Sequence, residues 1–296
     1  MSNTVVEDEE AGGRLSMPAP GVKRYLAGYM DRPHLETFVG ESLAIRPKDE
    51  VDQFWARHAS TSDEKGKLAP IPLDDGQLRP LDGPDAEWVQ SVASTDRFKR
   101  EIAGPHAFAW VPIDKLLAFQ PLIDEGPPSP GASADEVLRW CLPSEFPKTA
   151  ADKPQFMANP AWSGPRLVLG TRDMNAQLSF EVRDDGLSLS LVPRGNWLQV
   201  AVVGSRLILR NGYHRTCALA AAGHTHVPAL VLPMPDLASA IPQSPAFFGA
   251  DYLQRLPRPP MVMDFLSPDL TVELAHTPQK RVVEIRFDIM EMRIPT

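Results

Sequence analysis

The chain has 296 residues, with 38 acidic and 30 basic side chains, a formal charge of -8, 43% hydrophobic and 23% charged residues. This composition is typical of a globular protein with a sizeable core, in one large domain or two medium ones. Its 31 prolines exclude an all-helical bundle, and its negative charge weakens the case for indiscriminate nucleic-acid binding. The acidic start, the lack of a bilayer-length apolar run and only two cysteines, Cys141 and Cys217, predict a cytoplasmic protein without disulfides or a membrane partner.

Residues 1–50 are acidic and contain glycine and proline, so we expect a partly disordered arm with one short helix at 22–30. Apolar residues at helical spacing then predict a helical extension over residues 51–107, with one amphipathic helix starting from Asp49 and a second from Asp85. The proline- and glycine-rich stretch between them is expected to be a surface loop.

A central domain is expected over residues 108–235. Its first strand, FAWVP, runs into Asp114, which is placed to cap a helical turn. Ser133 and Glu136 form a capping box for a short peripheral helix that Pro143 ends. Residues 236–296 are proline-rich and aromatic, and we expect them to wrap the core and to end in the strand RVVEIRFDI.

The sheet of this domain is predicted from two β-hairpins, which turn at Asp185-Gly186 and at Gly204-Ser205. After the second hairpin, residues 206–232 predict a strand, an Asn211-Gly212 turn, a helix, a stop at Gly223 and a second strand parallel to the first.

The start of that helix carries the strongest functional signal. The unpaired N–H groups and the dipole of a first helical turn attract anions, and Gly212 allows a ligand close to the backbone. Arg210, His214 and Arg215 gather where the dipole disfavours cations, in a stretch from residue 186 to 235 without Asp or Glu. A bound phosphate would make this arrangement favourable. The alternative is a simple strand-to-helix turn with a solvated Arg215.

The run Asn211-Gly212-Tyr213-His214-Arg215, followed by Ala218-Leu219, Gly223 and Val227-Pro228, resembles the superfamily shared by ParB-type partition proteins and sulfiredoxin. VPIDKL at 111–116 resembles the opening strand of that domain. The resemblance covers roughly residues 108–232 and implies an α/β (α+β) domain with a small mixed sheet, here with a helical N-terminal extension and a proline-rich C-terminal wrap.

The resemblance also implies a ligand, a nucleoside triphosphate (ATP or CTP) with Mg²⁺. The residues expected to hold its phosphates are Arg210, Asn211, Gly212, Tyr213 and Arg215. Relatives include CTP-binding clamps, nucleases, free-serine kinases and sulfinic-acid reductases. Tyr213 stands where sulfiredoxin has its cysteine, and the tail does not suggest a helix-turn-helix, so reductases and segregation clamps fit less well.

A phosphate- or nucleotide-binding protein, as a nuclease or an NTP-dependent phosphotransferase, is therefore the first functional hypothesis. Its catalytic residues would be His214, Arg215 and an acid, for which Asp114, Asp124 and Glu125 are the candidates and Asp114 the one assigned. Nucleic acid is a further candidate partner.

The alternative is a non-catalytic interaction protein that binds a protein partner through its N-terminal arm or proline-rich tail, where LQRLPRPP at 253–260 is either a surface connector or an extended ligand. No metal site is expected, because no acid or cysteine completes the set of His214, His224 and His226.

Overall fold

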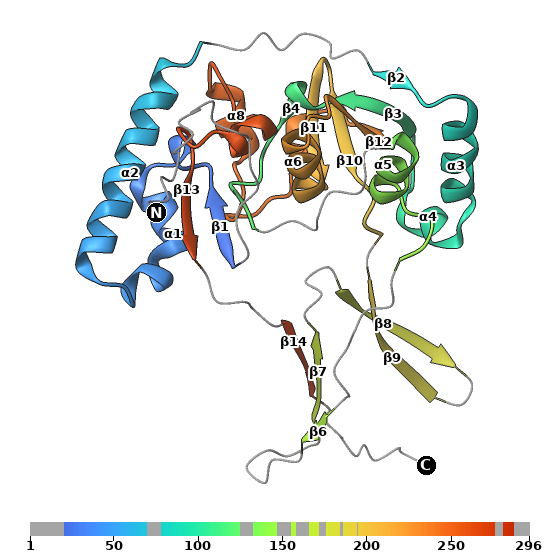
Figure 1. The fold of residues 1–296 in the computed structure, drawn as a ribbon. Coiled ribbons are helices and arrows are strands. Elements are labelled where there is room, and N and C mark those ends of the chain that lie inside the picture. Colours follow the sequence, from blue (N-terminus) through green and yellow to red (C-terminus); the bar gives the residue numbers. More distant parts are fainter. Residues whose placement is uncertain are drawn as a thin grey trace, which may run out of the picture.

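The computed structural model describes residues 21–69, 78–124, 133–146, 155–157, 166–171, 176–183, 186–193, 195–275 and 281–286, with the backbone alone for the strands between 155 and 193 and for 281–286. These residues form a mixed α/β protein (Figure 1), as the sequence predicts. None of the described helices is long and apolar enough to cross a membrane.

The largest sheet has six strands, and its two central strands lie parallel. In order across the sheet the strands are β2 (Arg79–Pro80), β3 (Ala107–Pro112), β12 (His226–Pro233), β10 (Gln199–Val203), β11 (Arg206–Asn211) and β4 (Leu116–Leu117). Strand β12 is buried without interruption from Val227 to Leu232, the pattern of a strand that is covered on both faces.

The expected parallel pair of strands around the Asn211-Gly212 turn is wrong, because β11 and β12 are not neighbours and run in opposite directions. Strand β10 lies between β11 and β12; it pairs antiparallel with β11 and parallel with β12. The parallel strands are β10 and β12. The connection between them contains strand β11 and helix α6 (Tyr213–Ala221). Gly223 ends α6 at a φ of 90°, as predicted.

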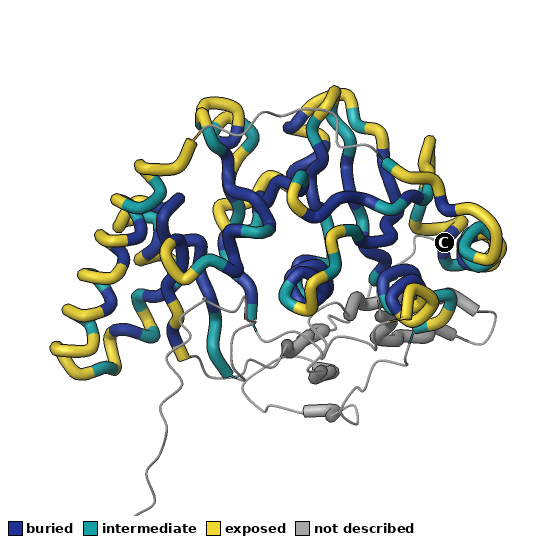
Figure 2. The backbone as a smooth tube through the Cα atoms, turned by 45° about the horizontal axis from the view of Figure 1, so that its top comes forward, coloured by how far each residue is buried: buried dark blue, intermediate teal, exposed yellow. Residues whose placement is uncertain are grey.

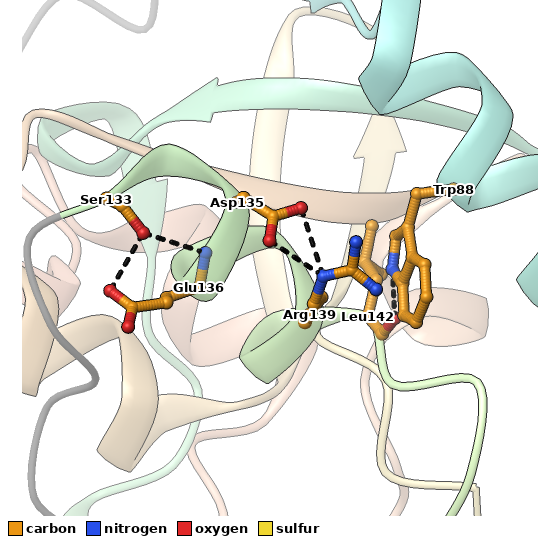
Figure 3. A network of polar contacts seen from close by, with 6 residues as sticks. All are labelled: Trp88, Ser133, Asp135, Glu136, Arg139 and Leu142. Atoms are coloured by element: carbon orange, nitrogen blue, oxygen red, sulfur yellow. Dashed lines mark hydrogen bonds and ion pairs between the residues drawn. The ribbon is translucent and has the colours of Figure 1, made fainter.

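Helix α5 (Ala134–Cys141) lies beside α6 over the same face of the sheet (Figure 1). Its expected capping box is formed only in half: the Ser133 hydroxyl accepts from the Glu136 N–H at 3.3 Å, but the Glu136 carboxylate accepts from the Ser133 hydroxyl, at 2.8 Å, and not from the Ser133 N–H (Figure 3). The outer face of α5 contacts the Trp88 indole, which donates to the Leu142 carbonyl at 2.9 Å and lies under the Arg139 guanidinium. The helix is not peripheral as expected, because its other face is buried against β12. The residues of that buried face are Val137, Leu138 and Cys141.

The predicted amphipathic helices are confirmed, with different ends. The first is α2 (Lys48–Lys67), which buries Phe54 and His58. The second is two helices, α3 (Gly83–Ser94) and α4 (Asp96–Glu101), because the Thr95 side chain accepts from the Phe98 N–H at 3.2 Å and so caps a new helix. The 3₁₀ helix η2 (Ile113–Lys115) follows β3 without a side-chain cap from Asp114.

A second sheet joins distant parts of the chain in the order β13 (Val272–Ala275), β1 (Val22–Tyr25) and β5 (Leu122–Ile123). Residues 21–50 are thus not an irregular arm, and 22–30 is not a helix. They form β1, the 3₁₀ turn η1 (Ala27–Tyr29), helix α1 (Arg32–Ala44) and the first residues of α2. Strand β1 exists because its backbone pairs with β13 some 250 residues later, a long-range pairing that overrides local propensity.

The segment after β12 connects the two sheets through helices α7 (Leu237–Ala240) and α8 (Ala250–Arg255) and the 3₁₀ helix η3 (Val262–Leu266). Its Phe248 and Phe265 belong to the one continuous core (Figure 2). Pro259 and Pro260 are buried as well. Part of the run LQRLPRPP is therefore buried, so the run as a whole is neither an exposed ligand nor a surface connector.

Further strands pair outside these two sheets. Strands β14 (Arg281–Arg286), β7 (Arg166–Thr171) and β6 (Gln155–Met157) form one sheet, and β8 (Ala176–Arg183) pairs with β9 (Gly186–Pro193). The predicted first hairpin and the closing strand are thus confirmed, but the hairpin is a two-stranded sheet of its own and not part of the domain's main sheet as expected. Asp185, in its turn, lies outside the described residues.

Candidate functional site

The Asn211-Gly212 turn needs its glycine. Gly212 caps α6 at a φ of 101°, and a β-carbon there would stand 2.8 Å from Cγ of Leu198. The backbone thus enters the helix in the left-handed conformation, packed against the strand side of the turn. The space beside Gly212 is filled by the chain's own leucine.

Tyr213 points into the core and not toward a ligand. It is 2% exposed, and its hydroxyl accepts from the N–H groups of Phe119 at 2.9 Å and Gln120 at 3.3 Å. Burial raises the pKa of this phenol. Cys217, one turn further along, is also fully buried, and burial raises the pKa of its thiol to about 12, so it offers no reactive thiolate.

Arg215 is buried too, with 6% of its surface exposed. One guanidinium nitrogen donates to the carbonyls of Trp140 at 3.0 Å and Cys141 at 3.1 Å, and the other donates to Oδ1 of Asn196 at 3.0 Å. Both carbonyls belong to the last turn of α5, where the helix dipole is negative. The arginine at the start of α6 therefore caps the end of α5, and both of its terminal nitrogens donate to groups of the protein.

His214 has a carboxylate partner on the surface. Its Nε2 lies 2.5 Å from Oδ1 of Asp124 and 3.2 Å from the Asp124 N–H, with about a third of the imidazole exposed. A protonated ring donates to the carboxylate, whereas a neutral ring with its proton on Nδ1 accepts from the N–H. The pair can thus exchange a proton while it stays in contact.

Of the three candidate acids, only Asp124 is placed at His214 by the described structure. The Ile113 N–H donates to the Thr225 carbonyl at 2.9 Å, so the neighbouring Asp114 lies by the end of α6, about 12 Å of helix away from its start. There it acts on His226, whose pKa is lowered by burial and by Arg79 and raised in part by Asp114. Glu125 lies outside the described residues.

Arg210 differs from the other two cations. The register between β10 and β11 shifts by one residue, from Gln199 opposite Asn211 to Val200 opposite Leu209, which leaves Arg210 without an opposite residue. Such a β-bulge redirects a side chain. The guanidinium is half-buried, burial lowers its pKa, and it forms no hydrogen bond or ion pair with any described residue.

Arg210 and Asn211 line a cavity of about 860 Å³. Its lining mixes polar residues, with Asn196 and Gln199 besides these two, and apolar residues, with Phe247 among them. The remaining lining residues are Glu101, Ile102, Ala103, Pro105, Gly195, Leu232, Pro233 and Met234. Glu101 is the one acid among the described residues of this lining. Its carboxylate accepts from the Gly195 N–H at 2.8 Å and lies 3.7 Å from Nε of Arg97.

The sequence motif thus separates into three groups. Arg210 and Asn211 face the cavity, Gly212, Tyr213 and Arg215 build the turn, and His214 lies with Asp124 outside the cavity lining. Asn196, Gln199 and Phe247 were not predicted, because they come from segments whose approach depends on the sheet register and on the path of the C-terminal segment.

Another cavity, of about 550 Å³, is lined by residues of α2 and of the segment 266–273. Its buried arginine, Arg24, already donates to Glu273 and to the Phe265 carbonyl. Its other arginine, Arg57, is exposed, so no half-buried arginine of this cavity lacks a partner among the described residues. Among the described residues no group of three or more His, Cys, Asp and Glu side chains could hold a metal ion. Comparisons with protein-family models, with curated proteins and with solved structures give no significant match.

Proposed function

We propose that this protein binds a phosphorylated ligand, a nucleotide best of all, in the cavity at Arg210. The observation that carries the proposal is that Arg210 lines this cavity with a half-buried guanidinium that has no partner among the described residues. His214 and Arg215, the other two cations of the motif, are already matched by Asp124 and by the end of α5.

A phosphate at Arg210 would replace the hydrogen bonds to water that this guanidinium loses on burial. Each charge-assisted hydrogen bond to a phosphate oxygen contributes roughly 1.5 to 3 kcal/mol. The fork geometry of arginine suits two such bonds. The cavity of about 860 Å³ falls within the range of about 300 to 1,000 Å³ that is usual for small-molecule sites.

The lining fits a ligand's phosphate better than a magnesium ion held by the protein. Glu101 is its one carboxylate and is already engaged by Gly195 and Arg97, whereas Mg²⁺ prefers one or two free carboxylates. The His214–Asp124 pair could move a proton, but neither residue is in the lining. We therefore propose binding as the function and assign no nuclease or phosphotransferase step.

The resemblance to the ParB and sulfiredoxin superfamily remains a prediction, and within it ATP and CTP are the first ligands to test. The alternative, a scaffold that binds a protein through its tail, is less well supported. The tail aromatics Phe248 and Phe265 are buried in the core, so they are not available to a partner.

The test is isothermal titration of the full chain with ATP and with CTP, each with and without Mg²⁺. We expect Arg210→Ala to weaken binding by about tenfold or more, the loss of one or two charge-assisted hydrogen bonds. Arg206→Ala is the matched control, because Arg206 is on the same strand but outside the cavity lining. Equal affinities in both variants, or no binding by the wild type, would contradict the proposal.

A further inference from the structure

Two asparagines that line the Arg210 cavity are held in fixed orientations. Asn211 donates from Nδ2 to the Trp197 carbonyl at 3.0 Å and to Oδ1 of Asn196 at 3.2 Å. The same Oδ1 accepts from the buried guanidinium of Arg215 at 3.0 Å. Both amides therefore belong to one network that starts in the core.

The partners decide which end of each amide is free. A guanidinium only donates, so Asn196 must turn its oxygen to Arg215 and leave its NH₂ group free. A carbonyl only accepts, so Asn211 must turn its nitrogen to Trp197 and leave its oxygen free. Neither free end has a hydrogen-bond partner among the described residues. Neither is among the fully buried polar atoms that lack a partner, so both ends remain accessible.

The cavity wall thus presents a fixed donor, a fixed acceptor and the Arg210 cation, because all three residues line it. An adjacent donor and acceptor complement the amide or amidine edge of a nucleobase, where a carbonyl or ring nitrogen stands next to an N–H. Inorganic phosphate and sugar phosphates lack such an edge. Phe247 is also in the lining, and an aromatic ring suits the flat face of a base.

We infer that Asn196 and Asn211 are the specificity-determining residues of the site and that they bind the base edge of a nucleotide whose phosphate lies at Arg210. This inference rests on the proposed function. Arg215 is a positioning residue in it, because it fixes the Asn196 amide without reaching the ligand.

The experiment is isothermal titration of the full chain with inorganic phosphate, ribose 5-phosphate and the four nucleoside monophosphates. The best nucleotide is expected to bind about tenfold or more tightly than ribose 5-phosphate, as two added hydrogen bonds require. Its derivative with a methyl group on the ring nitrogen of that edge should lose this advantage. This arm uses the wild-type chain and is independent of variant folding.

Asn196→Asp tests the donor directly. The variant keeps an oxygen for Arg215 and Asn211 but replaces the free NH₂ group by an acceptor. Its added charge weakens all phosphates alike, so the readout is the ratio of nucleotide to ribose 5-phosphate affinity, which should fall about fivefold or more for one lost hydrogen bond. Phe247→Leu should lower the same ratio, because a leucine offers no aromatic face for the base.

The outcomes separate the two proposals. If ribose 5-phosphate binds as tightly as every nucleotide, or if the methylated nucleotide binds as well as its parent, the inference is overturned and phosphate binding at Arg210 stands. If no phosphorylated compound binds, the proposed function fails and the inference fails with it.

Discussion

At the scale of single residues, three cations around one helix start have three different roles. Arg215 neutralises the end of α5, His214 pairs with Asp124, and Arg210 faces an open cavity. The closeness of these three residues in the sequence therefore does not indicate that they share a function. The direction of each side chain follows from its position on a bulge, in a first helical turn or against a second helix.

Arg215→Met is expected to destabilise the fold by about 3 kcal/mol, because two helix-end carbonyls and the Asn196 amide lose a buried partner. Arg215→Lys should cost less, since an ammonium keeps the charge without the fork. Urea unfolding followed by circular dichroism measures both. Arg206→Met is the control and should stay within about 0.5 kcal/mol of the wild type. A loss that small for Arg215→Met would show that this arginine is not a structural cap.

At the scale of elements, the glycines at the two ends of α6 allow the cost of backbone strain to be distinguished from the cost of steric crowding. Both have positive φ, 101° at Gly212 and 90° at Gly223, but an added β-carbon meets Leu198 at 2.8 Å in the first case and nothing within 4 Å in the second. Gly223→Ala should cost about 1 to 2 kcal/mol, and Gly212→Ala about 3 kcal/mol or more. Chemical unfolding of both variants measures the difference, and equal losses would contradict the crowding at Leu198.

The elements that could be predicted from the sequence are those with local causes. Three examples are the apolar spacing of α2, the cap at Ser133 and the hairpin turn at Gly204. Each of them depends on residues that are only a few positions apart in the sequence. Strand β1 could not be predicted, because its partner β13 is almost the whole chain away. The site divides in the same way: Arg210 and Asn211 follow from the motif, whereas Asn196, Gln199 and Phe247 reach the cavity only through the tertiary fold.

At the scale of the whole molecule, the first and last parts of the described core hold each other. The Asp264 carboxylate accepts from the Tyr29 hydroxyl at 2.7 Å, from the Met261 N–H at 2.8 Å and from both guanidinium nitrogens of Arg258 at 2.7 and 2.8 Å. The Tyr252 hydroxyl also donates to the Tyr29 carbonyl. Together with the pairing of β1 and β13, these contacts make one core, and we expect the described sheets to unfold together.

The four tyrosines of the chain report on that shared core. Burial raises the pKa of Tyr25 and Tyr252 to about 12 and raises those of Tyr29 and Tyr213 as well, helped at Tyr29 by the Asp264 carboxylate. Unfolded tyrosines lose their protons near pH 10, whereas the folded ones keep theirs. The contribution to stability is therefore complete below pH 10 and is lost as the pH rises through about 12.

A spectrophotometric titration of tyrosinate, with circular dichroism of the same samples, checks this linkage. Since all four phenols are protected, we expect little ionisation at pH 10 and then a single steep rise that coincides with loss of helical signal. Tyr252→Phe is the control: it removes one phenol and should lower the final amplitude by about a quarter without separating the two signals, because absorbance is additive over four tyrosines. A tyrosine that ionises near pH 10 while the helices stay intact would show that the two ends of the core open independently.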